Sequence, residues 1–385
     1  MKKIKQLQKN KKKIKNNIKK MATQIPILSG DIGGTNSRLC LLKISSDPDA
    51  PHDLIDNKYL FSFNYKNAQD LLTQFLAPHK TSDHYPKFAV FGVPGPIKNN
   101  TVVQFTNVVH WGSVNGEELA KDLRIEKIVF MNDFVANGYG IQTHLIEGKD
   151  IITINNKKIN PNGPKATLGP GTGLGVGYLT KNEDDEYYLV SGSEGSHGDF
   201  APRNKLQFKF MKFLQKYYNV EHISVERATC GQSIIPIYKF LSEEFNLSYD
   251  LPLYEQIEVF QGTQNSNTQI QLNGQIIYKG LRKECELSER TLKFFCELYG
   301  QAAGNICLSY LPTGGLYLLG GVSGSLQSLI SHDDTWTKAF LDKGRMSKLL
   351  EDIPIFLVKV NDLALRGTIE YCRRMIAKYF KTGKI

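Results

Sequence analysis

The chain has 385 residues, 41% of them hydrophobic, which is enough for two cores and predicts two domains. Its net charge of +10 is concentrated, because residues 1–20 contain ten lysines and no acidic residue, and the rest of the chain carries no net charge. This distribution argues against a nucleic-acid-binding body, and no apolar run is long enough to span a membrane.

The chain begins with a Lys-rich extension. Like charges repel and little apolar surface is available, so residues 1–23 are expected to be disordered. No signal peptide is visible, because no apolar segment follows the charged start. The six cysteines are scattered without CxxC pairs, which indicates a reducing, cytoplasmic location and no structural zinc.

Strands and helices then alternate. Strands are predicted over Pro26–Asp31 and Ser37–Ile44, around a Gly-Gly turn. A strand at Leu54–Phe63, a helix at Ala68–Leu76 and a strand at Phe88–Val93 are predicted next. A helix then opens at Asn115, and a strand at Lys127–Met131 leads into a helix after Asp133.

The second half repeats this pattern. Strands at Ala166–Gly169 and Gly175–Thr180 flank another glycine turn. Later elements are two long helices, two strands and a closing helix, at Lys205–Tyr217, Glu289–Tyr310, Gly315–Leu319, Ile355–Val360 and Leu363–Tyr379. The polar stretch Gly262–Gln275 is expected to be an exposed hairpin or loop. Two similar turns, one in each half, suggest a duplicated domain with a cleft between the halves.

Both turns are suited to phosphate. In the first, Gly33 and Gly34 allow close backbone approach to an anion, Thr35 and Asn36 add donors, and Asp31 could hold a hydrated Mg²⁺. The turn is neither a Walker loop nor a Rossmann fingerprint, and an ordinary Gly-rich hairpin remains an alternative.

The second turn and a third glycine pair strengthen this reading. Leu168–Gly177 contains five glycines and Thr172, and Gly320 and Gly321 follow an apolar strand, where a nucleotide base or ribose could lie. Each could be a plain turn, but three glycine-rich strand ends in one chain favour nucleotide binding.

A carboxylate follows the strand that ends at Met131. Asp133 could accept a hydroxyl proton during phosphoryl transfer, and on its position alone it could equally cap the following helix. Further on, Glu194 and His197 lie in a Gly-rich loop and Glu226 follows, residue types that bind sugar hydroxyls. For His197, a loop histidine without a role is the alternative.

With these residues in view, the chain resembles the bacterial-type glucokinases of the hexokinase/actin-like ATPase superfamily. The resemblance runs from about Ile27 to Gly367. It rests on GDIGGTN (Gly30–Asn36), FGVPGP (Phe91–Pro96), Thr106-Asn107, NDF (Asn132–Phe134), GPGTGLGV (Gly169–Val176), SEGSHGDFAP (Ser193–Pro202), ISVER (Ile223–Arg227) and DKGR (Asp342–Arg345).

The resemblance implies a role for each matching position. Asp133 is implied as the general base on the 6-hydroxyl of glucose. The implied hydroxyl-binding set is Asn107, Asn132, Asp133, Glu194, His197 and Glu226. The implied ATP-binding set is Asp31, Gly33, Gly34, Thr35, Asn36, Gly171, Thr172, Gly320 and Gly321, with Mg²⁺ accompanying ATP. A homodimer is implied as well.

The fold implied is an α/β, two-domain actin-like ATPase (ribonuclease H-like) fold with an interdomain cleft. A small domain would cover residues 24–143, completed by the helix at 366–385, and a large domain would cover 144–365. Two other functions share this fold. A sugar-responsive regulator would carry a helix-turn-helix segment, and an actin-like structural ATPase would lack the hydroxyl-binding set, so the sequence favours the kinase.

Overall fold

The computed structural model describes residues 24–45, 51–105, 108–182, 185, 187–248, 250, 253, 255–258 and 266–382. The Lys-rich extension and Asn107 therefore lie outside the described residues. The chain forms two compact units: unit 1 holds residues up to Thr143 and from Asp362 on, and unit 2 holds His144–Asn361.

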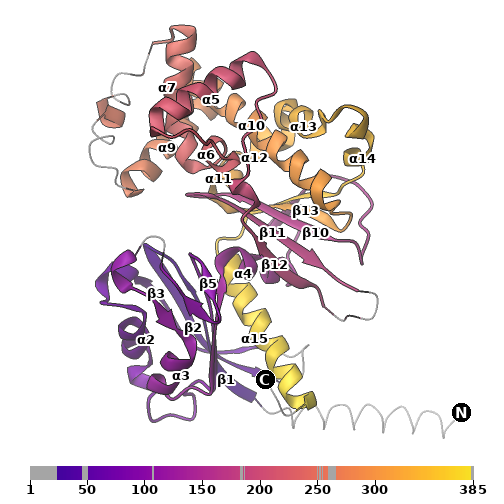
Figure 1. The fold of residues 1–385 in the computed structure, drawn as a ribbon. Coiled ribbons are helices and arrows are strands. Elements are labelled where there is room, and N and C mark those ends of the chain that lie inside the picture. Colours follow the sequence, from indigo (N-terminus) through magenta and orange to yellow (C-terminus); the bar gives the residue numbers. More distant parts are fainter. Residues whose placement is uncertain are drawn as a thin grey trace, which may run out of the picture. The chain divides into compact units, whose positions relative to one another are not determined.

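Unit 1 is built on a five-stranded sheet in the order β3-β2-β1-β4-β8 (Figure 1). Strands β1, β4 and β8 are parallel, whereas β2 is antiparallel to both β1 and β3. All six residues of β4 are buried, as expected for a parallel strand covered on both faces. The strand bounds are β1 (Gln24–Ile32), β2 (Asn36–Ser45), β3 (Asp53–Phe61), β4 (Phe88–Val93) and β8 (Lys127–Asn132).

Local capping chemistry sets two of the helix starts in unit 1. The Asn115 side chain accepts hydrogen bonds from two backbone N–H groups at the start of α3. The Asn132 side chain accepts one from a backbone N–H group at the start of α4. The other elements are short. The bounds are α2 (Ala68–Leu76), α3 (Gly116–Leu123), α4 (Asp133–Gly140), η1 (Ser62–Asn64), η2 (Ala77–His79), η3 (Val109–Trp111), β5 (Ile97–Lys98), β6 (Thr101–Val102) and β7 (Val114–Asn115).

The C-terminal helix α15 (Leu363–Thr382) belongs to unit 1 and packs on α4, β1 and β4 (Figure 1). The contact is very close, because a Cβ on Gly367 would lie 1.7 Å from the carbonyl oxygen of Ala136. The Ser29 hydroxyl donates to Thr368 Oγ1 at 2.8 Å and ties β1 to the helix. The last helix therefore covers one face of a sheet formed by the first residues of the unit.

Unit 2 contains a six-stranded sheet in the order β12-β11-β10-β13-β14-β9. Its first five strands in this order have the same directions as the five strands of unit 1, with antiparallel pairing at one side and parallel pairing at the other. The repeated topology agrees with the duplication predicted from the two glycine turns. The bounds are β9 (Ile151–Asn155), β10 (Lys165–Pro170), β11 (Leu174–Thr180), β12 (Leu189–Ser193), β13 (Gly315–Leu318) and β14 (Ile355–Val358).

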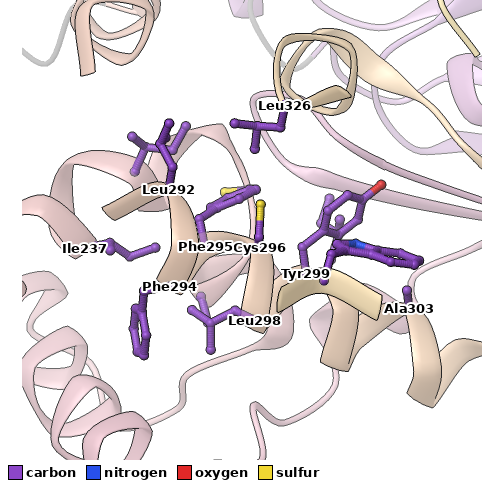
Figure 2. Close-up of a cluster of buried hydrophobic side chains, with 14 of the residues drawn as sticks. Ile237, Leu292, Phe294, Phe295, Cys296, Leu298, Tyr299, Ala303 and Leu326 are labelled. Atoms are coloured by element: carbon purple, nitrogen blue, oxygen red, sulfur yellow. The ribbon is translucent and has the colours of Figure 1, made fainter. Parts of the chain in front are cut away.

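The core of unit 2 surrounds α10 (Glu286–Tyr310). Figure 2 shows side chains of this helix packed with Ile237 and Leu326. Consecutive residues Phe294, Phe295 and Cys296 are all buried, so a broad face of the helix is covered, while Arg290 and Lys293 remain exposed on the other face. The surrounding helices are α5 (Lys205–Tyr218), α6 (Val225–Ala228), α7 (Ile234–Phe245), α9 (Ser266–Leu281), α11 (Gly320–Ser325), α12 (Gln327–His332), α13 (Asp334–Leu341) and α14 (Ser347–Glu351), with η4 (Gly195–His197), η5 (Gly231–Ser233) and η6 (Gly344–Met346).

The expectation of an exposed hairpin or loop over Gly262–Gln275 is wrong from Ser266 onward, where α9 begins. The apolar residues that the helix buries are few, with Leu272 and Ile276 one turn apart and Ile277 beside them. Polar residues dilute this helical spacing, and packing against α10 stabilises the helix instead.

Along the described helices, none combines the length and the apolar character that a membrane crossing requires.

Candidate functional site

The first glycine turn joins β1 to β2 and is closed by a hydrogen bond from Gly33 N to Asn36 O at 2.9 Å. Ser62 supports it from outside. Its hydroxyl donates to Gly33 O at 2.7 Å, and its backbone N–H donates to Thr35 O at 2.9 Å. A Cβ on Gly33 would lie 2.6 Å from Asn36 O, so the tight turn requires glycine there.

The second turn occupies the equivalent place in unit 2, between β10 and β11. Gly171 N donates to Gly173 O at 2.8 Å, so this turn is closed two residues on, one residue tighter than the first. Gly171 and Thr172 are exposed, so their polar groups are available to a ligand. The two hairpin turns lie in equivalent places of the two units, and the glycine backbone and threonine hydroxyl of each are suited to binding an anion.

Gly320 lies beside the second turn. It follows β13, which pairs in parallel with β10, and it has a φ of +88°, a conformation that favours glycine. A Cβ on Gly320 would lie 2.9 Å from Pro170 O, and Gly321 has open space around it. Unit 2 therefore brings Gly171, Thr172, Gly320 and Gly321 to one edge of its sheet.

Backbone pairing brings together the two segments that carry the predicted hydroxyl-binding residues of unit 2. Phe200 N donates to Ile223 O, and Val225 N donates to Gly198 O, each at 2.9 Å. Asp199 and Ser224 form a β-bridge between these two bonds. The loop Ser193–Phe200 therefore lies against the residues that lead into α6.

As a result, Glu194, His197 and Glu226 form one cluster. His197 Nε2 is 3.4 Å from Glu194 Oε2, and His197 Nδ1 is 3.9 Å from Glu226 Oε1. The His197 side chain is 56% exposed and that of Glu226 is 27% exposed, so polar groups of both can reach solvent or a ligand. Carboxylates that accept and an imidazole that can donate or accept are suited to binding sugar hydroxyls.

Glu226 also contacts the second turn. Leu174 N donates to Glu226 Oε2 at 2.8 Å, and a Cβ on Gly173 would lie 2.4 Å from the same oxygen. The carboxylate therefore fits against bare glycine backbone. The cluster of Glu194, His197 and Glu226 and the second turn are therefore adjacent in unit 2.

Asp133 and Asn132 lie at the carboxyl edge of the unit 1 sheet. Pairing aligns Asp31 with Gly92 and Gly92 with Met131, so Asp31, near the end of β1, and the Asn132-Asp133 pair, at the end of β8, lie on the same edge of the sheet with β4 between them. Asn132 is the N-cap of α4, and its Oδ1 accepts from Phe134 N at 2.9 Å. Asp133 Oδ1 lies at the same distance from that N–H, but Asn132 already supplies the cap.

The first turn has features that suit a hydrated cation. Burial raises the pKa of the Asp31 carboxyl from 3.8 to about 6, against a smaller opposite effect of Arg38, so a cation near the carboxylate would stabilise its charged form. Asn36 Oδ1 is buried and makes no hydrogen bond among the described residues, and a water bound to Mg²⁺ could donate to it. These residues fit Mg²⁺.

Within the described part of the chain, no three His, Cys, Asp or Glu side chains gather into a metal site. The expectation of no structural zinc stays a prediction. Asn107 cannot be placed, since it lies outside the described residues.

Three residues in these surroundings were not predicted. Ser62 supports the first turn, Gly231 donates to the second, and Asn273 holds Gly231 in turn. All three are distant in sequence from the turns they support, and no local motif marks them.

Comparison with known proteins gives one consistent family. The family model described as Glucokinase matches residues 28–375. A glucokinase of Nostoc sp. strain PCC 7120 is 36% identical over 343 residues, which cover 89% of this chain and 97% of that protein.

Solved structures agree in fold. The glucokinase of an Antarctic psychrotroph is 26% identical, with a TM-score of 0.71 over 91% of this chain and 99% of that chain. A ROK family glucokinase from Streptomyces griseus, solved in complex with glucose and AMPPNP, has a TM-score of 0.56 at 16% identity and covers 91% of this chain and 99% of its own. This chain is mixed α/β, and its structural neighbours are sugar kinases with the actin-like ATPase fold.

Proposed function

The chain belongs to the Glucokinase family, and we propose that it transfers the γ-phosphate of Mg-ATP to the 6-hydroxyl of D-glucose, giving glucose 6-phosphate and ADP. The observation that supports this proposal is the contact between Glu226 and Leu174, because it joins the cluster that we propose to bind hydroxyls to a glycine turn suited to phosphate. A kinase needs both sites next to each other, because the hydroxyl must attack the terminal phosphate.

We propose that ATP lies with its phosphates at the two glycine turns, held by Gly33, Gly34, Thr35, Asn36, Gly171 and Thr172. Gly320 and Gly321 would contact the adenosine side. The complex of the S. griseus enzyme with AMPPNP supports an adenine nucleotide. Asp31 and Asn36 would hold a hydrated Mg²⁺, which neutralises phosphate charge when it is bound.

Asp133 is the proposed general base. It lies at the carboxyl edge of the sheet, directly after a strand, and the helix cap does not depend on it because Asn132 provides one. In this role the carboxylate accepts the proton of the 6-hydroxyl as that oxygen attacks the γ-phosphate. Asn107, Asn132, Glu194, His197 and Glu226 would bind the hydroxyls of the sugar.

We further propose that units 1 and 2 correspond to the small and large domains and that the substrates bind in a cleft between them. Closure on glucose would exclude water that could otherwise hydrolyse ATP. All six cysteines are free, which supports a reducing, cytoplasmic compartment. A homodimer is proposed from the family resemblance.

A coupled assay of ADP formation over a panel of sugars tests this function. Glucose should give rapid ADP formation, and 6-deoxyglucose should give none because it lacks the acceptor oxygen. ADP formation at the same rate without sugar would contradict the proposal, since the protein would then be an ATPase.

A further inference from the structure

Asn273, on helix α9, is a buried polar residue with a directed contact. The residue is 8% exposed, and its Nδ2 donates to the carbonyl oxygen of Gly231 at 2.7 Å. On the same helix, Gln269 Nε2 is 3.5 Å from the carbonyl oxygen of Gln232, the next residue of η5. Helix α9 therefore holds the η5 turn through side-chain amides.

Gly231 passes this contact to the second glycine turn. Its N–H donates to Gly171 O at 2.8 Å, and Gly171 N closes the turn onto Gly173 O at 2.8 Å. The approach is close, because a Cβ on Gly231 would lie 2.5 Å from Gly171 O. A chain of hydrogen bonds thus runs from Asn273 through the backbone of a single residue, Gly231, to the turn.

We propose that Asn273 is a positioning residue for the phosphates of the nucleotide, and this rests on the proposed placement of ATP at the second turn. Gly171 and Thr172 are exposed glycine-rich backbone, which has many accessible conformations of its own. A phosphate nest works only when its N–H groups are fixed before the anion arrives. The Asn273 amide fixes Gly231 from the buried side, and Gly231 then fixes Gly171.

A second observation separates this role from ordinary packing. Asn273 Oδ1 is buried and has no hydrogen-bond partner among the described residues. A buried acceptor without a partner is costly, so an apolar side chain would suit the core better if packing were the purpose. The hydrogen bond that Nδ2 donates to Gly231 therefore explains why this position holds an asparagine.

The test compares Asn273→Leu and Asn273→Asp with the wild-type full-length chain. Both variants remove the Nδ2 donor, so the KM for ATP and the Kd of Mg-AMPPNP should rise about tenfold. The Kd of glucose measured without nucleotide should stay within about twofold, because Asn273 reaches the cluster of Glu194, His197 and Glu226 only indirectly, through the second turn. Asn273→Gln keeps an amide donor and should recover part of the nucleotide affinity.

Gln271→Glu is the matched control for Asn273→Asp, since it adds the same charge at an exposed position of the same helix. It should leave both substrates unaffected. Equal losses for glucose and Mg-AMPPNP in Asn273→Leu would overturn the proposal, because they would indicate a general structural role. Unchanged Mg-AMPPNP affinity in both Asn273 variants would also overturn it.

Thr172→Val distinguishes this inference from the proposed function itself. If Thr172→Val weakens Mg-AMPPNP and the Asn273 variants do not, the phosphate site stands and the positioning role fails. If neither change affects nucleotide binding, the placement of ATP at the second turn is wrong, and the positioning role fails with it.

Discussion

The carboxylate of Glu226 accepts a hydrogen bond from the backbone N–H of Leu174, 2.8 Å away, while its other oxygen lies 3.9 Å from His197 Nδ1. One side chain thus belongs to the cluster proposed to bind sugar hydroxyls and also holds the end of the second glycine turn. Ligands at these two places should therefore influence each other through Glu226.

Two substitutions at Glu226 should separate its two contacts. Glu226→Gln keeps an acceptor for Leu174 N but removes the charge, so the KM for glucose should rise about tenfold or more and the KM for ATP should change little. Glu226→Ala removes both contacts and should raise both constants. His197→Ala, which leaves Leu174 bonded, is the control and should affect glucose alone. Steady-state kinetics with each substrate varied would decide, and an unchanged KM for ATP in Glu226→Ala would contradict the link.

Asp133→Asn should lower kcat by about 10²–10⁴-fold and change glucose affinity far less. Asn132 provides the cap of α4, so the thermal midpoint should stay close to that of the wild type. Stopped-flow or coupled assays at saturating ATP and glucose give kcat, and calorimetry gives the glucose Kd. A variant with near-normal kcat would show that Asp133 is only a helix-end residue.

Thr35→Val and Thr172→Val each remove one hydroxyl donor from a proposed phosphate turn without changing side-chain size. Each should weaken ATP by about five- to tenfold and leave glucose binding nearly unchanged. Thr180→Val offers a control, because Thr180 lies at the far end of β11 from the second turn. Separate titrations of the two substrates are needed. If either variant lost affinity for glucose but not for ATP, the assignment of that threonine to the phosphate site would be wrong.

The raised pKa of Asp31 predicts how stability depends on pH. The folded-state pKa is about 6 and the ordinary value is 3.8, so the folded state takes up the proton first as the pH falls. Between about pH 6 and pH 4 the cost of the buried charge is therefore relieved, whereas above pH 6 it is fully present. Asp31→Asn removes this charge and should stabilise the protein by about 2 kcal/mol at pH 8, with the gain disappearing toward pH 4.

Urea unfolding without Mg²⁺ at pH 8 and at pH 5 measures this difference. The exposed residue Asp122, in the same unit, provides the control Asp122→Asn, which should show a much smaller effect. Mg²⁺ should compete with the proton at Asp31, so its apparent affinity should fall as the pH drops through about 6. A gain in stability that is equal at both pH values would contradict the assignment to Asp31.

Gly367→Ala should destabilise unit 1 by about 3 kcal/mol or more. The added Cβ would lie 1.7 Å from the Ala136 carbonyl oxygen, so α15 must move away from α4. Gly274→Ala is the matched control, because Gly274 lies within helix α9 with nothing within 4 Å of an added Cβ, and alanine there should be neutral or stabilising by up to about 1 kcal/mol. Chemical denaturation of both variants checks the contrast. Equal stability of the two would mean that α15 does not pack as described.

Much of the fold follows from local sequence patterns. The glycine turns and the apolar strand at Phe88–Val93 are visible in the sequence because short-range sterics and burial on both faces leave a local pattern. The same holds for the Asn115 cap of α3, where a side chain bonds N–H groups two and three residues away. The roles of the individual residues of the candidate site come from their chemistry and from family motifs, and they stay predictions.

The sequence failed where the stabilising contacts are distant along the chain. Helix α9 has too few apolar residues to show a helical period, and it forms because α10 covers it. The meeting of His197 with Glu226 depends on the backbone bonds of Phe200 with Ile223 and of Val225 with Gly198.

The connection from Asn273 through Gly231 to the second turn is of the same kind. Apart from the Asn273 amide, these bonds join backbone groups that almost every residue carries, so the sequence does not show which groups pair. Only the packed tertiary structure decides which of them meet.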